Sequence, residues 1–353
     1  MERRNFITTL GAAIAIPAVS KLAAAAGSNS SVDSDLIRPP VLRPGDTVGL
    51  ITPSTYVSDP DQLALVDRTI KYFGLKAKIG KNVAKRAGYL GGSIDERLDD
   101  LHAMFRDPEV RAIFAIRGGY GSAQLLDRID YDLIRKNPKI FLGYSDITAL
   151  HLAINRHAGL ITFHGPVVLS RFTDYTQGYF KKALFETKPI GVVTNPPASN
   201  ELRPNHSLRT VRPGRARGRL IGGNLTLIST TMGTPYEIET RGRILFIEDV
   251  GEEPYRIDRM LTQLRLAGKF KDVAGVIFGE CSGCKPNDYQ PGFNSTFTLG
   301  EIVDQFFGQM NVPVISGLTI GHTDDQITLP EGAMATLDAD KGEIVIEETV
   351  TRD

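Results

Sequence analysis

The chain has 353 residues, of which 41% are hydrophobic and 23% charged, as in ordinary soluble globular proteins. Lys plus Arg and Asp plus Glu number 41 each, so the composition provides no basic field of the kind that nucleic-acid-binding proteins carry. A chain of this length is expected to form two domains.

The N-terminal segment has the features of an export signal. Arg3-Arg4 precede Phe6-Ile7 and an Ala-rich apolar run, and the small residues Ala24–Ala26 offer a cleavage point. Paired arginines in this position resemble a twin-arginine signal, which predicts export by the twin-arginine machinery to the periplasm. A Sec signal and an uncleaved membrane anchor are the alternatives, although the apolar run is interrupted by Pro17 and is short for a membrane span.

Strands and helices alternate through the first half of the chain. The pattern predicts, in order, a strand and loop over 45–54, helices over 59–75 and 94–110, two strand–turn–helix units over 111–129 and 139–159, and a strand over 160–168. This alternation indicates a parallel sheet with helices on its faces.

The second half contains more strand. Apolar runs predict strands over 218–228, 242–250, 273–281 and 343–351 and helices over 254–268 and 298–310. We therefore predict an N-terminal parallel-sheet α/β domain and a C-terminal β-rich α/β domain. The expected segments are an export signal (1–26), a linker (27–43), the N-terminal domain (44–186), a Pro- and Asn-rich crossover (187–213) and the C-terminal domain (214–353).

A serine occupies the corner between the predicted strand and helix of 139–159. Ser145, in Gly-Tyr-Ser-Asp-Ile, lies where ligands bind in open α/β sheets, at the carboxyl end of a strand. One interpretation is a nucleophile elbow, in which the N–H of Asp146 at the helix start stabilises an oxyanion. The other is that Ser145 caps the helix, because serine is a favoured N-cap.

A glycine-rich turn, Arg117-Gly-Gly-Tyr-Gly121, follows the preceding strand. Its backbone amides suit a phosphate cradle, an oxyanion donor at Gly119, or a tight turn that needs positive φ. The phosphate-binding motif G-x-x-x-x-G-K-[ST] and a complete G-x-G-x-x-G are absent from the sequence.

A serine nucleophile needs a base and an acid that orients the base. Among six histidines, His164 ends a strand and His322 opens a polar loop after an apolar run, so both are candidates. The run Ile244–Ile247 delivers Glu248 or Asp249 to a strand end. The sequence has no HExxH motif and no other compact group of metal ligands, which disfavours a metallopeptidase.

The two cysteines, Cys281 and Cys284, form a single C-x-x-C pair. One such pair does not complete a four-ligand zinc site, and in an oxidising compartment it can form a disulfide. We interpret the pair as structural.

Six segments together resemble the serine LD-carboxypeptidase family, which includes muramoyl-tetrapeptide carboxypeptidases and microcin C immunity peptidases. They are RGGYGSAQLLDRIDYDLI, KIFLGYSDITALHLAI, GLITFHGP, GRLIGGNLTLI, ILFIEDVGEEPYRIDRMLTQL and GHTDDQITLPEGAMATLD. The resemblance covers roughly residues 45–350. It implies a Rossmann- or flavodoxin-like N-terminal domain, a β-rich C-terminal domain, a homodimer and a reaction without cofactor or metal.

Carried over by motif, the resemblance implies a catalytic triad of Ser145, His322 and Glu248. The implied oxyanion donors are the amides of Gly119 and Asp146. Arg117 is a candidate for binding the terminal carboxylate of a substrate, with a structural ion pair to an aspartate such as Asp127 or Asp130 as the alternative.

The resemblance implies a serine carboxypeptidase that hydrolyses an L,D-peptide bond and releases terminal D-Ala from murein tetrapeptides. Because the chain carries an export signal, we expect peptidoglycan-derived peptides in the periplasm to be its substrates. One alternative is a microcin-C-immunity-like peptidase or amidase acting on a peptidyl-nucleotide. Another, from a different class, is a periplasmic solute-binding protein with two α/β domains around a cleft.

Overall fold

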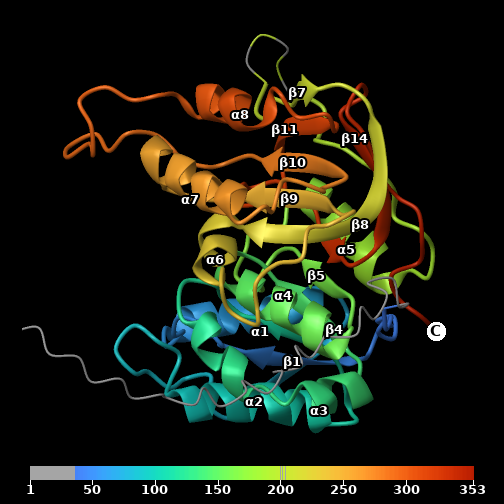
Figure 1. Cartoon of the computed structure of the whole chain (residues 1–353). Coiled ribbons are helices and arrows are strands. Elements are labelled where there is room, and N and C mark those ends of the chain that lie inside the picture. Colours follow the sequence, from blue (N-terminus) through green and yellow to red (C-terminus); the bar gives the residue numbers. More distant parts are fainter. Residues whose placement is uncertain (1–35, 199, 201, 203) are drawn as a thin grey trace, which may run out of the picture. The chain divides into compact units, whose positions relative to one another are not determined.

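The computed structural model describes residues 36–198, 200, 202 and 204–353, and these form one compact unit. The predicted export signal and the first part of the predicted linker lie outside the described residues. The unit contains two β-sheets. In Figure 1 the first sheet lies among helices coloured blue to green, and the second sheet is coloured mostly yellow to red. This arrangement confirms the predicted fold class.

The first sheet has six strands in the order β12-β5-β4-β3-β1-β2. Its strands are β1 (Thr47–Ile51), β2 (Lys76–Ile79), β3 (Val110–Ala115), β4 (Ile140–Gly143), β5 (Thr162–His164) and β12 (Leu329–Glu331). The first five are parallel in the flavodoxin-like order 2-1-3-4-5, and β12 is antiparallel to β5 at the edge.

Helices cover both faces of this sheet. They are α1 (Pro60–Tyr72), α2 (Ile94–Arg106), α3 (Tyr131–Lys136), α4 (Thr148–Ala158), α5 (Asp174–Phe185) and the 3₁₀ turns η1 (Ser122–Arg128) and η2 (Ser145–Ile147). Helices α1 and α2 both begin at N-cap residues that form side-chain hydrogen bonds. Asp59 accepts from Asp61 N–H, and Ser93 forms a capping box with Glu96. Apolar residues of α2, α3 and α4 pack on one face of the sheet, whereas those of α1 and α5 pack on the other.

The second sheet has eight strands in the order β6-β14-β13-β8-β9-β10-β11-β7. They are β6 (Gly191–Val193), β7 (Arg209–Arg212), β8 (Arg215–Asn224), β9 (Ile244–Glu248), β10 (Gly275–Gly279), β11 (Val314–Leu318), β13 (Met334–Asp338) and β14 (Glu343–Ile346). Strands β8 to β11 are parallel and the outer pairings are antiparallel. The helices α6 (Leu225–Thr230), α7 (Pro254–Leu266) and α8 (Leu299–Phe307) contribute to the core on one face.

The two sheets share a hydrophobic core. One cluster of buried side chains contains Leu142 and Phe163 from the first sheet together with Phe246 and Ile277 from the second. The chain also crosses back, because β12 follows β11 of the second sheet in sequence yet pairs with β5 of the first. The candidate site therefore lies between two sheets that pack as one body.

Two predicted segments contain more structure than their composition indicates. Residues 36–43 of the predicted linker pack on the body: Val41 and Leu42 are buried, and Ile37 forms a bridge with Leu160. The Pro- and Asn-rich crossover 187–213 contains β6 and β7, which extend the two edges of the second sheet. Short edge strands of three or four residues lack the periodicity by which longer strands are recognised.

In the described part of the chain, no helix has both the length and the apolar character that a membrane crossing requires.

Candidate active site

Ser145 has a left-handed backbone conformation, with φ of 64°, and it is the one non-glycine residue with positive φ among those described. Its side chain caps neither η2 nor α4. The structure thus excludes the interpretation of Ser145 as a helix cap. Such a strained strand-to-helix corner is the geometry of a nucleophile elbow.

A glycine lies opposite this corner. A Cβ on Gly118 would lie 3.1 Å from the Cβ of Ser145, which is tighter than most such contacts, so a larger residue would require the two segments to move slightly apart.

The structure brings Ser145, His322 and Glu248 together from distant parts of the chain. The hydroxyl of Ser145 donates to Nε2 of His322 at 3.0 Å, and Nδ1–H of His322 donates to Oε2 of Glu248 at 2.7 Å. Glu248 ends β9 and its side chain is fully buried, whereas 17% of the His322 side chain is exposed. Of the two acids that the sequence left open, Glu248 rather than Asp249 contacts the histidine.

The surroundings favour a cationic His322. Burial by itself would lower the pKa of this imidazole, but the hydrogen bond that its Nδ1–H donates to Glu248 and the charges of Glu248 and Asp249 outweigh that effect, and the pKa is raised above its usual value. The ring of Tyr144 lies 4.9 Å from the imidazole ring, centroid to centroid, and restricts its orientation. These surroundings therefore stabilise the protonated form of His322 and hold its ring in one orientation.

Asn224 holds the acidic side of the site, a role that the sequence did not reveal. Its Nδ2 donates to Oε1 of Glu248 at 3.3 Å and to Oδ1 of Asp249 at 3.1 Å, and its Oδ1 accepts from Leu227 N–H at 3.2 Å. Asn224 and Glu248 are register partners at the ends of β8 and β9. Residues 225–228, which the apolar run assigned to a strand, instead begin α6, and Asn224 is the N-cap of this helix; an asparagine after Gly222-Gly223 was the one sequence signal for that change.

Asp249 forms a second buried acid behind the triad. Its Oδ2 accepts from the N–H and the hydroxyl of Thr226, both at 2.9 Å. Burial, reinforced by the charge of Glu248, raises the pKa of Asp249. Asp249 thus ties the end of β9 to α6.

The side chain of Asp146 connects the serine corner to the glycine-rich turn. Its carboxylate accepts from the hydroxyl of Ser54 at 2.5 Å and from the amides of Ser122 and Gly121 at 2.8 and 3.2 Å. The buried Arg97 donates to the carbonyl of Gly121 at 2.8 Å. These contacts fix the two backbone segments on which the predicted oxyanion donors lie.

The two predicted oxyanion donors remain available. Within the described residues, the amides of Gly119 and Asp146 donate to no protein acceptor. Gly119 has φ of 113°, and a Cβ there would clash with the hydroxyl of Thr55, which accepts from Tyr120 N–H. A glycine is therefore required for the amide of residue 119 to take this position.

The other histidine candidate, His164, is a buried structural residue. Its Nε2–H donates to the carbonyl of Ile320 at 2.6 Å. His151, which follows Ser145 on α4, donates likewise to the carbonyl of Gly143 at 2.8 Å. Neither contacts the serine hydroxyl.

Arg117 is exposed at the start of the glycine-rich turn. In the described part of the structure it forms no ion pair, so the alternative pairing with Asp127 or Asp130 is not observed. Asp130 instead caps α3. The exposed Arg117 immediately precedes Gly118, which lies close to Ser145.

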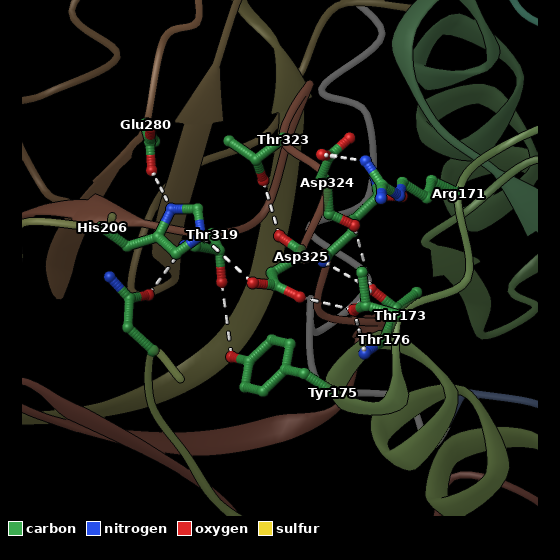
Figure 2. A network of polar contacts seen from close by, with 12 residues as sticks. Arg171, Thr173, Tyr175, Thr176, His206, Glu280, Thr319, Thr323, Asp324 and Asp325 are labelled. Carbon is green, nitrogen blue, oxygen red and sulfur yellow. Dashed lines mark hydrogen bonds and ion pairs between the residues drawn. The ribbon is translucent and has the colours of Figure 1, made fainter. Parts of the chain in front are cut away.

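An open cleft of about 520 Å³ adjoins His322. Figure 2 shows part of its wall, where His206 lies between Glu280 and Asp325, with Nδ1 2.7 Å from Glu280 Oε2 and Nε2 3.3 Å from Asp325 Oδ2. Arg171 pairs with Asp324 at 2.8 Å on the same wall. The segment 171–207 thus contributes Arg171, Thr173 and His206 to the cleft.

Comparison with known protein families matches both halves of the chain. The model of the LD-carboxypeptidase N-terminal domain matches residues 48–165, and that of the C-terminal domain matches residues 217–337. Together the two matches include Ser145, Glu248 and His322.

The chain is similar over most of its length to proteins of the same family. It is 41% identical over 319 residues to a probable murein peptide carboxypeptidase of Bacillus subtilis, covering 89% of this chain and 95% of the relative. It is 30% identical to the murein tetrapeptide carboxypeptidase of Pseudomonas aeruginosa, covering 83% and 94% of the two chains.

Among solved structures, the Escherichia coli microcin C7 self-immunity protein MccF superimposes with a TM-score of 0.80 at 28% identity, covering 90% of this chain and 100% of MccF. The binding-protein alternative finds no support, since the matched domains are those of peptidases. The chain belongs to the LD-carboxypeptidase family of serine peptidases.

Proposed function

We propose that the chain is a serine carboxypeptidase that hydrolyses the L,D-peptide bond of murein tetrapeptides and releases terminal D-Ala. The observation that carries this proposal is the hydrogen-bonded series from Ser145 through His322 to the buried Glu248, built on a strained serine corner. The murein peptide carboxypeptidases among its relatives support the substrate class.

In the proposed mechanism, His322 takes the hydroxyl proton as Ser145 Oγ attacks the scissile carbonyl. Glu248 holds the imidazole in the tautomer that presents Nε2 to the serine, and its charge stabilises the imidazolium that forms. His322 then gives the proton to the departing amine of D-Ala. Water, activated by the same histidine, hydrolyses the acyl-enzyme.

The amides of Gly119 and Asp146 are proposed to bind the oxyanion. Both belong to segments that the Asp146 carboxylate holds together, so the two donors are oriented before the substrate arrives. Preorganised donors of this kind contribute on the order of 3 kcal/mol each to transition-state stabilisation.

Arg117 is proposed to bind the carboxylate of the terminal residue. It precedes the oxyanion turn and carries an exposed guanidinium without an ion-pair partner among the described residues. Guanidinium groups bind carboxylates through two parallel hydrogen bonds, which would orient the scissile bond over Ser145.

Hydrolysis of a peptidyl-nucleotide is the second candidate function, because MccF shares the fold and has been solved with adenosine monophosphate. The cleft beside His322 argues against it. Three carboxylates, those of Glu280, Asp324 and Asp325, line the cleft with Arg171, which is already paired. This surplus of negative charge disfavours an anionic nucleotide group.

Mass spectrometry of a purified disaccharide tetrapeptide tests the proposal. Incubation with the chain is expected to yield the tripeptide and free D-Ala, and Ser145→Ala is expected to leave the tetrapeptide intact. An aminoacyl sulfamoyl adenosine, assayed in parallel, is expected to remain unhydrolysed. Cleavage of the adenosine conjugate with the tetrapeptide untouched would replace the proposal with the second candidate.

We also propose that the protein acts in the periplasm after export through the twin-arginine machinery. The sequence of the first residues supports this proposal, with Arg3-Arg4 before an apolar run. Fractionation of cells expressing the full chain is expected to place it in the periplasm, and Arg3-Arg4→Lys-Lys is expected to retain it in the cytoplasm. Unchanged export of the lysine variant would exclude a twin-arginine signal.

A further inference from the structure

Cys281 and Cys284 are the chain's two cysteines, and both are free thiols. They occupy the first and last positions of a β-turn that follows β10: Cys284 N–H donates to the carbonyl of Cys281 at 3.4 Å, and Gly283, the third residue, has φ of 68°. A β-turn keeps its end Cα atoms within about 7 Å, and disulfides join Cα atoms about 4.4–6.8 Å apart. The backbone is therefore already suited to a Cys281–Cys284 disulfide.

The two thiols differ in chemical character. Interaction with the Cys284 thiol, together with burial, raises the pKa of Cys281, whereas interaction with Cys281 lowers the pKa of Cys284. Because the thiolate is the attacking species in disulfide exchange, Cys284 is the nucleophile and Cys281 the resolving thiol.

The turn also contacts the base of the candidate triad and the segment that follows the acid. The hydroxyl of Ser282, inside the turn, donates to the carbonyl of His322 at 2.6 Å. The carbonyl of Ser282 accepts from Gly251 N–H at 2.9 Å, in the segment that follows Glu248. A constraint on this turn is thus transmitted to the backbone of His322.

A metal site does not account for the pair. Among the described residues, no group of three or more His, Cys, Asp or Glu side chains is arranged to hold a metal ion.

We propose that Cys281 and Cys284 form a thiol–disulfide exchange site, and that its closure fixes Ser282 against His322. The Cys284 thiolate attacks a small disulfide such as oxidised glutathione, and one glutathione thiolate leaves. Cys281 gives up its proton and attacks the Cys284 sulfur, which releases the second glutathione. Two electrons and two protons pass from the cysteine pair to the external disulfide, which becomes two thiols.

Thiol mapping tests the exchange step. The purified chain is reduced, desalted, incubated with oxidised glutathione, alkylated under native conditions and analysed by mass spectrometry. We expect an intramolecular disulfide without a glutathione adduct. Cys281→Ser is expected to stop at a Cys284–glutathione mixed disulfide, and Cys284→Ser to leave Cys281 unreacted. Two thiols that stay free in the native protein, or an adduct on Cys281, would overturn the site.

The effect on turnover rests on the proposed function and is measured separately. The oxidised form is expected to melt a few degrees higher than the reduced form, as short disulfide loops typically give. Its kcat/KM for the murein tetrapeptide is expected to be severalfold higher. This redox difference should disappear in Ser282→Ala and in the Cys281→Ser/Cys284→Ser double variant.

The outcomes separate the two ideas. Equal kcat/KM in the reduced and oxidised wild type would overturn the coupling of the turn to His322. Turnover of the tetrapeptide in neither redox form would count against the proposed function and leave the exchange site to be decided by thiol mapping.

Discussion

The Nε2–H of His164 donates to the carbonyl of Ile320 at 2.6 Å and so joins the end of β5, in the first sheet, to the segment that carries His322. Ile320 precedes His322 by two residues. The bond is fully buried, and burial lowers the pKa of His164, which therefore remains a neutral donor. His164, which the sequence offered as a candidate base, thus links the sheet that carries Ser145 to the loop that carries His322.

Replacement of His164 by phenylalanine is expected to reduce kcat on the order of 10- to 100-fold, because small displacements of a catalytic group have effects of this size. The side chains of Ser145, His322 and Glu248 are unchanged in this variant. Labelling of Ser145 by a phosphonate should therefore become slower but should still occur. Unchanged kcat in a folded His164→Phe protein would show that this bond does not position His322.

The backbone strain at Ser145 predicts a difference between two inactive variants. Ser145→Gly relieves the positive φ of 64°, whereas Ser145→Ala retains it. Urea unfolding is expected to find the glycine variant more stable than the alanine variant by about 1 kcal/mol. Equal stability would mean that the corner is not strained in solution.

Glu248→Gln is expected to lower kcat by on the order of 10³–10⁴, because the imidazolium loses its counter-charge. The charge of Glu248 raises the pKa of His322 against the effect of burial, and the base must be unprotonated to act. Activity of the wild type should therefore fall as the pH drops through this raised pKa.

In the variant, burial remains while the opposing charge is lost, so the acidic limb of kcat/KM should move to lower pH. If the acidic limb of the kcat/KM profile moves to higher pH or does not move, it reports the titration of a group other than His322.

Arg117→Ala is expected to raise KM for the tetrapeptide about tenfold or more with little change in kcat, which is the effect of losing a charged hydrogen bond made equally in ground and transition states. Arg117→Lys retains the charge and should recover part of the loss. A tetrapeptide amide, which lacks the terminal carboxylate, should be insensitive to both substitutions. Sensitivity of the amide would assign Arg117 to another contact.

His151 predicts sensitivity to acid. It is fully buried, donates to the Gly143 carbonyl, and burial lowers its pKa to about 3. Since the unfolded chain binds this proton near pH 6.5, the contribution of the residue to stability is complete above that pH and is lost as the pH falls towards the folded value.

Because of His151, we expect the free energy of unfolding to decrease by about 2 kcal/mol when the pH is lowered from 7 to 5. His151→Gln retains a donor for Gly143 but does not titrate there, so its urea-unfolding midpoint should vary less over this range. An equal pH dependence of the two proteins would place the acid sensitivity elsewhere.

Much of the candidate site could be predicted from local patterns. The change from a buried strand to helical spacing located Ser145 at a strand end, and the apolar run before Glu248 did the same for the acid. Choosing Glu248 over Asp249 and His322 over His164 required the family resemblance, because Ser145 and His322 are 177 residues apart. No local pattern encodes which strand ends meet across a domain interface.

The roles of Asn224 and of strand β12 could not be predicted from the sequence, because they depend on how distant segments pair. Asn224 acts on Glu248 because β8 and β9 pair in the register that sets these two residues side by side. Strand β12 has three residues, and nothing in them indicates that they join the first sheet rather than the second. Register and sheet membership are set by tertiary packing, which a single sequence does not display.

The return of β12 to the first sheet has a consequence for biosynthesis. As the chain emerges from the ribosome, the half that bears the proposed nucleophile Ser145 is made early, but its outermost strand and the proposed base His322 are made at least 177 residues later. Until residues 329–331 are available, β5 presents an unsatisfied edge, and until His322 is made the proposed reaction has no base. If the proposed mechanism holds, the growing polypeptide therefore cannot hydrolyse peptides before both His322 and β12 have been made.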